Sequence, residues 1–137
     1  PIEIFNVNGL RVVVIGLANI SSLNSIVKGG NSLQVFPQEE HQVVQQWIDV
    51  LAPQVNLVVV LSHLGLSEDQ LVIQDTSGID LYLGGHHHIV LNPPMVRMDC
   101  QTEIAQENTQ NRLKSNGEKG CEPRPVILAH PGAFNKL

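Results

Sequence analysis

The sequence predicts an α/β fold with a mixed sheet, and three patterns support this. Two short apolar stretches flank Asn8-Gly9, the favoured two-residue hairpin turn, and so predict a pair of antiparallel strands. Residues 38–51 place apolar side chains at helical spacing. A β-branched run, a short helical segment and a second apolar run then follow with short connections, which is the order of a βαβ unit with parallel strands.

The hairpin begins with Ile2 to Val7, where apolar and polar residues alternate. Its second strand, Leu10 to Gly16, contains the apolar run Val12 to Ile15 and is expected to be buried. The next stretch, Ala18 to Phe36, is rich in Ser, Asn and Gly. It predicts a long irregular connection of the kind that is often functional or mobile.

The segment Gln38 to Leu51 is predicted to be an amphipathic helix, which Pro53 ends. The residues on its apolar side are Val43, Val44, Trp47, Ile48 and Leu51. Trp47 could stack on a substrate, but its helical spacing favours a place in the core. His41, on the same helix, is expected at the surface.

The βαβ unit begins with Leu57 to Ser62, a continuous β-branched run typical of a parallel strand buried on both faces. Ser67 to Gln70 has the form of a capping box, which predicts a helix running to about Asp75. Ile79 to Leu83 is the second parallel strand, and Val126 to Ala129 is a last strand.

Composition argues against two classes of partner. The chain of 137 residues carries a net charge of −5, and its eight Lys and Arg are scattered, so a long nucleic acid is not an expected partner. No apolar run approaches the roughly 20 residues of a membrane helix, so no membrane span is expected. Small phosphorylated substrates remain compatible with the charge, because bound cations can supply the positive charge they need.

Three histidines follow the two parallel strands directly. His63 comes after the first strand, and Gly84-Gly85-His86-His87-His88 comes after the second. The carboxyl ends of parallel strands share one edge of a sheet, where ligands of open α/β sheets bind. If residues 86–88 are extended, His86 and His88 point to one side and His87 points away. Imidazoles that converge on rigid strand ends indicate a metal site.

Each histidine also has a plainer interpretation. An isolated triplet of histidines is usually a polar loop in water, and His63 alone would be a hydrogen-bonded structural residue. The shared edge favours metal binding for both. His130, at the end of the last strand, fits either a structural or a functional role.

The stretch from Asn92 to Pro125 is polar and is expected to be an exposed insertion. Cys100 and Cys121 bracket the central part of this stretch, the insertion at about 100–121. A disulfide between them would close this loop and stabilise the folded chain by roughly 3 kcal/mol. Two free thiols are the alternative. The disulfide is the favoured interpretation and places the chain in an extracytoplasmic compartment, periplasmic or secreted, although a cytoplasmic one stays open.

Two groups of residues resemble a known family. Leu57 to Gly65, with its Ser62-His63 pair, and Gly84 to His88, with its Gly-His-x-His pattern, resemble the second half of the calcineurin-like metallophosphoesterase domain of 5′-nucleotidases. Asn8 to Leu17 and Val126 to Phe134 are similar to the strands that enter and leave that half. The chain as a whole, 1–137, therefore resembles the C-terminal half of the catalytic domain, with an insertion at about 100–121.

The resemblance implies a part of a four-layer αββα sandwich with mixed sheets. It also implies two divalent metal ions, from among Zn, Mn, Fe, Ca and Mg, and a metal-activated hydroxide that attacks the phosphate ester of a substrate such as a nucleotide. Carried over residue by residue, His63 and His86 would bind one metal and His88 the other.

The family's Asp-x-His, Gly-Asp and Gly-Asn-His motifs are absent from this sequence. They belong to the N-terminal half, so no catalytic residue and no substrate-binding residue is assigned here. We expect the isolated chain to be inactive, and activity to need a longer parent protein or a complex with the missing half. Two alternatives stay open: another metal-dependent hydrolase, and a non-catalytic structural or binding module that keeps the fold without a complete metal site.

Overall fold

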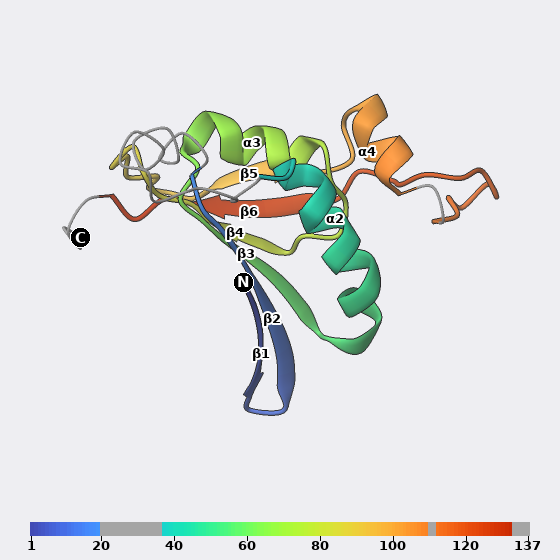
Figure 1. Cartoon of the computed structure of the whole chain (residues 1–137), viewed down its shortest axis with the longest axis horizontal. Helices are drawn as coiled ribbons and strands as arrows, with labels where there is room; N and C mark the ends of the chain where they lie inside the picture. Colours follow the sequence, from blue (N-terminus) through green and yellow to red (C-terminus); the bar gives the residue numbers. More distant parts are fainter. Residues whose placement is uncertain (20–36, 110–111, 133–137) are drawn as a thin grey trace.

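The computed structural model describes residues 1–19, 37–109 and 112–132. Within these residues, six strands form one mixed sheet in the order β1-β2-β3-β4-β6-β5, with helices packed on it (Figure 1). The α/β fold with a mixed sheet is confirmed. The elements are β1 (Ile2–Val7), β2 (Leu10–Leu17), α2 (Glu40–Leu51), the 3-10 turn η1 (Ala52–Gln54), β3 (Leu57–Ser62), α3 (Leu66–Gln74), β4 (Leu81–Leu83), β5 (Met95–Met98), α4 (Glu103–Asn108) and β6 (Pro125–Ala129).

The predicted hairpin is present, and β1 pairs antiparallel with β2 through residues 2–7 and 10–15. Asn8 and Gly9 have φ angles of 49° and 86°, the left-handed values that a tight hairpin turn requires. Strands β2, β3, β4 and β6 run parallel, and β5 closes the far edge antiparallel to β6. The irregular connection predicted for residues 18–36 lies almost wholly outside the described residues.

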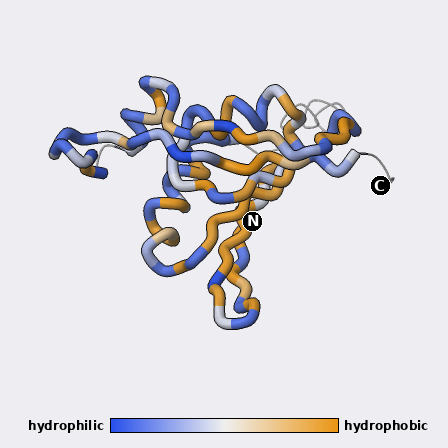
Figure 2. Tube along the Cα trace, turned by 180° about the vertical axis from the view of Figure 1, so that it is seen from behind, coloured by the Kyte–Doolittle hydropathy of each residue, from blue (hydrophilic) through white to orange (hydrophobic). Residues whose placement is uncertain are grey.

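One core lies between the sheet and the two larger helices, α2 and α3. Its sheet side consists of alternate strand residues that share a face, and its helix side consists of buried apolar residues of α2 and α3. The strand members are Val13, Ile15, Val58, Val60, Tyr82, Val126 and Leu128, and the helix members are Val44, Ile48, Val72 and Ile73. Viewed from behind, the hydrophobic colours follow the strands and the hydrophilic ones the turns (Figure 2).

Among the described residues, the opposite face of the sheet is only partly covered. Six strand residues that point away from the helices keep between 39% and 60% of their surface exposed, and we call them the open face: Phe5, Val7, Leu57, Leu61, Val96 and Ile127. The prediction that β3 is buried on both faces is therefore wrong. Its helix side is buried at Val58 and Val60, and Val59 on the other side is buried too, but its neighbours on that side, Leu57 and Leu61, are 39% and 53% exposed.

Two expectations for the helices are also wrong. Trp47 is 42% exposed, because Gln45 takes the inward position and its side-chain amide bonds both backbone groups of Ser77. The capping box is not formed, because α3 begins at Leu66 with Gly65 at its N-cap, where φ is 108°. Ser67 is thus inside the first turn, and the Asp69 side chain points into the protein.

The stretch predicted to be a polar insertion is more structured than expected. It supplies β5, whose Arg97 donates to Gln70 of α3, and α4, whose N-cap Thr102 accepts from the Ala105 amide. A disulfide joins Cys100 and Cys121, the pairing favoured from the sequence. In Figure 1, α4 lies at the end of the sheet opposite the yellow segment that follows β4.

Among residues 1–19, 37–109 and 112–132, no helix is long and apolar enough to cross a membrane.

Candidate functional site

Two of the three predicted ligands meet at the carboxyl edge of the parallel strands. His63 follows β3 and His86 lies three residues beyond β4, and the two strands are in register through Leu61 and Leu83. The centroids of the His63 and His86 rings are 5.2 Å apart, with the ring planes at 75°. Both side chains are exposed. The edge predicted from the βαβ order therefore brings these two imidazoles side by side.

The loop that carries His86 to His88 is not extended. His86 and His88 have positive φ angles of 80° and 55°, so the expected alternation of side chains does not apply. His87, expected to point away, packs instead with its ring centroid 4.9 Å from that of His86. Its Nδ1 accepts a hydrogen bond from the Leu66 amide at 3.3 Å, next to the start of α3. Gly65 makes room for this ring, because a Cβ there would lie 2.5 Å from its Cε1.

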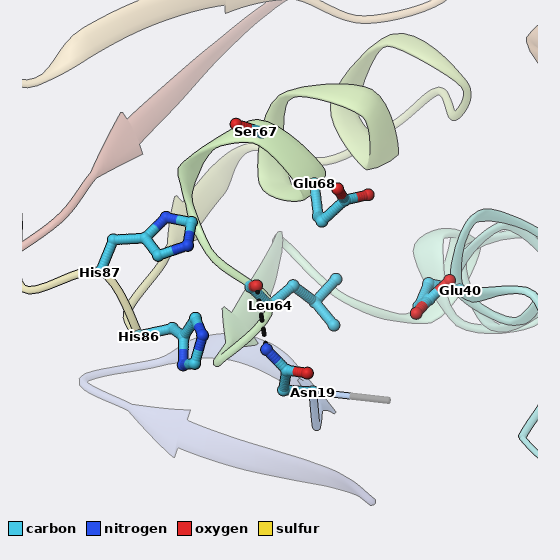
Figure 3. Close-up of a pocket in the computed structure, with 7 residues that line it drawn as sticks. All are labelled: Asn19, Glu40, Leu64, Ser67, Glu68, His86 and His87. Atoms are coloured by element: carbon cyan, nitrogen blue, oxygen red, sulfur yellow. Dashed lines mark hydrogen bonds between the residues drawn. The ribbon is translucent and has the colours of Figure 1, made fainter. Parts of the chain in front are cut away.

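A hollow of about 370 Å³ lies in front of His86 and His87 (Figure 3). Figure 3 shows the two imidazoles on one side of it and Glu68 and Glu40 on the other. Asn19 closes its base and donates to the Leu64 carbonyl at 3.2 Å. The hollow is therefore lined by groups that can bind cations or donate and accept hydrogen bonds.

The histidine loop is held at both ends by the last residue of β6 and the residues that follow it. The Gly84 amide donates to the Ala129 carbonyl at 2.9 Å, and the Leu91 amide donates to the His130 carbonyl at 3.0 Å. Val90 also forms an isolated antiparallel bridge with Pro131. The loop thus leaves the sheet and returns to it at one place.

A buried polar cluster lies beneath this loop. Asp69, fully buried, accepts from the Ser62 hydroxyl at 2.6 Å and bonds His130 Nε2 at 2.7 Å. Tyr82 is buried beside Ser62 and Asp69, and its hydroxyl forms no hydrogen bond of good geometry within the described part of the chain. Burial raises the pKa of Tyr82 above its ordinary value, and the nearby Asp69 carboxylate adds to the rise, so this phenol stays neutral.

The His63–His86 pair suits a divalent cation, because neutral imidazoles are good ligands and both rings are accessible at a rigid edge. The part of the chain that the structure describes contains no group of three or more His, Cys, Asp or Glu side chains able to hold a metal by themselves. Two imidazoles make an incomplete coordination sphere, so further ligands would have to come from elsewhere. Metal binding by His63, His86 and His88 stays a prediction.

Sequence reasoning missed the buried cluster of Ser62, Asp69 and His130. In the sequence, Asp69 was an acidic residue in the first turn of a predicted helix, and His130 had no visible partner. The sequence held one signal for them. Asp69 comes seven positions after Ser62, at the end of one predicted strand, and His130 comes directly after another, so both could lie near the edge where these strands end. Their meeting depends on the strand order, which local sequence patterns do not give.

Comparison with known proteins supports the resemblance derived from the motifs. No family model matches the chain. A 5′-nucleotidase of Diplobatis ommata is 30% identical over 92 residues, which cover 66% of this chain and 15% of that protein. A snake venom 5′-nucleotidase of Crotalus adamanteus is 27% identical over 139 residues, covering 99% of this chain and 21% of that protein.

The fold has a counterpart among solved structures. The structure of the NAD nucleotidase of Haemophilus influenzae matches this chain with a TM-score of 0.64 and 18% sequence identity. The match covers 98% of this chain and 22% of the nucleotidase. The chain thus spans about a fifth of the length of the proteins it matches most fully. Its resemblance to the 5′-nucleotidase-like metallophosphoesterases, predicted from the sequence, is confirmed.

Proposed function

We propose, from its resemblance to the 5′-nucleotidase-like metallophosphoesterases in sequence and fold, that this chain forms part of a metal-dependent phosphoester hydrolase. The observation that carries the proposal is the pairing of His63 and His86 at the carboxyl edge of the parallel strands. A nucleotide or a related phosphate ester is the proposed substrate, because the similar proteins are named as nucleotidases.

In this proposal His63 and His86 hold one divalent cation, and His88 contributes to a second. Bound cations would neutralise the phosphate and activate water for attack on phosphorus. The chain's own residues supply orientation. Gly84 and Gly85 allow a close approach of the loop to the strand end, and the 370 Å³ hollow beside His86 offers space next to the proposed metal site.

The remaining ligands are proposed to come from an N-terminal half of the same domain, outside this chain. The open face supports the presence of a missing half, because contiguous exposed apolar side chains such as Leu61 and Ile127, 53% and 50% exposed, mark a surface that packs against another part of the protein. A second sheet packed on the open face would complete a four-layer sandwich. We expect Leu61→Asp in the full-length protein to destabilise the domain by about 2 kcal/mol or more, whereas Leu113→Asp, on a 73% exposed side chain, should change little. Equal stabilities of the two variants would contradict the buried interface.

The experiment that tests the function measures bound metal and phosphate release in the full-length protein with a panel of nucleoside monophosphates, diesters and sugar phosphates. His63→Ala and His86→Ala should each lower metal content and reduce hydrolysis by at least about a hundredfold. His41→Ala on α2 is the control and should keep both. Hydrolysis by the isolated chain that is lost on His88→Ala would contradict the proposed need for the missing half.

A second candidate is a non-catalytic module that keeps the fold. The observation in its favour is that the described residues hold no group of three metal-binding side chains. The same measurement separates the two candidates, because a module would bind no stoichiometric metal and release no phosphate from any substrate of the panel.

We also propose an extracytoplasmic location, which the disulfide between Cys100 and Cys121 supports. Labelling of thiols in protein taken directly from its source would test this. Two reactive cysteines would point to a reducing compartment instead.

A further inference from the structure

We propose that the buried Ser62–Asp69–His130 cluster is the positioning framework of the histidine site. Through Asp69, it fixes the two chain segments that carry His63 and His86. The part that concerns metal binding rests on the proposed function. The part that concerns the position of the two segments rests on the geometry alone.

Asp69 is the centre of the cluster. Its side chain is fully buried in the first turn of α3, and its two oxygens bond Ser62 Oγ at 2.6 Å and His130 Nε2 at 2.7 Å. A carboxylate only accepts hydrogen bonds, so the Nε2 of His130 carries the proton. Ser62 is the last residue of β3, and His130 follows β6 directly. One carboxylate therefore ties the ends of two strands to the helix that covers them.

The first of the two segments contains His63. Its neighbour Ser62 is bound to Asp69, and the same Ser62 hydroxyl accepts from the Leu64 amide at 3.1 Å. The His63 amide itself donates to the Leu17 carbonyl at 3.1 Å. The backbone on both sides of His63 is thus fixed by hydrogen bonds, and two of these end on the Ser62 hydroxyl.

The second segment is the loop from Gly84 to Leu91, which contains His86. Both its ends bond the backbone at Ala129 and His130, and the His130 ring is anchored on Asp69. Gly84 lies directly on the cluster, because a Cβ there would overlap both His130 Nε2 and Asp69 Oδ2. The loop therefore takes its position from the same carboxylate as His63.

A polar cluster suits this role better than apolar packing of the same volume. Apolar contact is non-directional, whereas short hydrogen bonds to a carboxylate fix both distance and angle. Two imidazoles that share a cation need this, because small displacements of a ligand weaken a metal site.

The test compares four variants of the full-length protein. Asp69→Ala and His130→Met remove the interaction, and His130→Gln keeps a side-chain N–H that can reach Asp69. Asp99→Ala is the matched control. Asp99 is equally buried and accepts from two backbone amides, those of Gly78 and Arg124, outside the histidine site.

The first readout is hydrogen exchange of the metal-free protein, measured in peptides that cover 62–66 and 84–91. Exchange of the Gly84 and Leu91 amides should rise by at least about tenfold in Asp69→Ala and His130→Met, and stay close to wild type in His130→Gln and Asp99→Ala. Unchanged protection in the first two, or equal loss in Asp99→Ala, would overturn the proposal. Should Asp69→Ala not fold, Ser62→Ala removes the two hydrogen bonds of the Ser62 hydroxyl, to Asp69 and from the Leu64 amide, but leaves the Asp69–His130 pair. It should loosen the 62–66 peptide alone.

The second readout is Co²⁺ binding followed by visible absorption. We expect Asp69→Ala and His130→Met to bind Co²⁺ on the order of 10- to 100-fold more weakly, with an altered spectrum, while His130→Gln keeps the wild-type spectrum. Loosened peptides with unchanged Co²⁺ affinity and spectrum would overturn the role in metal binding. If the wild-type protein binds no Co²⁺, the proposed function fails, and the exchange pattern decides the positioning role by itself.

Discussion

Gly84→Ala tests the close packing of the histidine loop on the buried cluster. The φ angle of Gly84 is not in the left-handed region, so the glycine is required by space and not by its backbone. A methyl group at this position would lie 2.7 Å from His130 Cδ2 and closer still to Nε2, where ordinary contacts are 3.4–4 Å. The alanine can fit only if the loop or the Asp69–His130 pair moves.

The cost has two parts. Breaking a buried hydrogen bond to a charged group costs about 1.5–3 kcal/mol. Forcing a methyl group into a packed region costs about 1–3 kcal/mol. Alanine also restricts the unfolded chain more than glycine does, which offsets about 0.4–1 kcal/mol of this destabilisation. We therefore expect Gly84→Ala to lower the free energy of unfolding by on the order of 2–5 kcal/mol.

Urea unfolding of the full-length protein measures this change. At an m-value of about 2 kcal/mol/M, the transition that includes this domain should move down by roughly 1–2.5 M. Gly117→Ala is the control, because its Cβ meets nothing within 4 Å and only its φ of 83° is unfavourable. A loss below about 0.5 kcal/mol for Gly84→Ala would refute the reasoning, because the site would then be able to relax without breaking the pair.

Three further outcomes are expected. Replacing both Cys100 and Cys121 with alanine should lower the free energy of unfolding by about 3 kcal/mol, because the disulfide closes a loop of 21 residues and so restricts the unfolded chain. The urea midpoint measures this change. Burial raises the pKa of Asp99 above its ordinary 3.8, so in the range just above that value the folded protein binds more protons than the unfolded chain. The stability of the wild type relative to Asp99→Asn should therefore fall as the pH rises through this range, measured by urea titrations at several pH values. Ile48→Ala, fully buried on α2, should cost about 2–5 kcal/mol, whereas Trp47→Ala, 42% exposed, should cost clearly less; thermal unfolding compares them.

Much of the sheet could be predicted from local patterns. The Asn8-Gly9 turn requires positive φ angles and an antiparallel partner, so its hairpin follows from turn chemistry alone. The short βαβ connections fix parallel β3 and β4, and with them the edge shared by His63 and His86. These features depend on residues that are close in sequence.

The parts that were missed depend on distant pairing. β5 is a four-residue edge strand after two prolines, and its partner β6 is some 30 residues further along the chain. Trp47 lost its core position to Gln45 because Ser77, 32 residues away, satisfies the buried amide. Asp69 had the pattern of an acidic residue in a helix's first turn, but the fold brings Ser62 and His130 to it. In each case a tertiary contact overrode a sound local preference.

The two ends of the sheet are fixed by different groups, and this leads to a last expectation. At the carboxyl edge the Asp69 cluster holds the histidine loop, whereas at the other end Asp99 and the disulfide hold the segment around α4. Separate sets of contacts should behave additively. An insertion of two residues after Gly117, at an open turn, should therefore leave hydrogen exchange at 84–91 unchanged. In a double-mutant cycle with Gly84→Ala, the losses in free energy of unfolding caused by the insertion and by the substitution should add, with an interaction energy below about 0.5 kcal/mol. A larger interaction energy would mean that the α4 segment and the histidine loop form one cooperative unit, so that changes in this segment could reach the proposed metal site through the sheet.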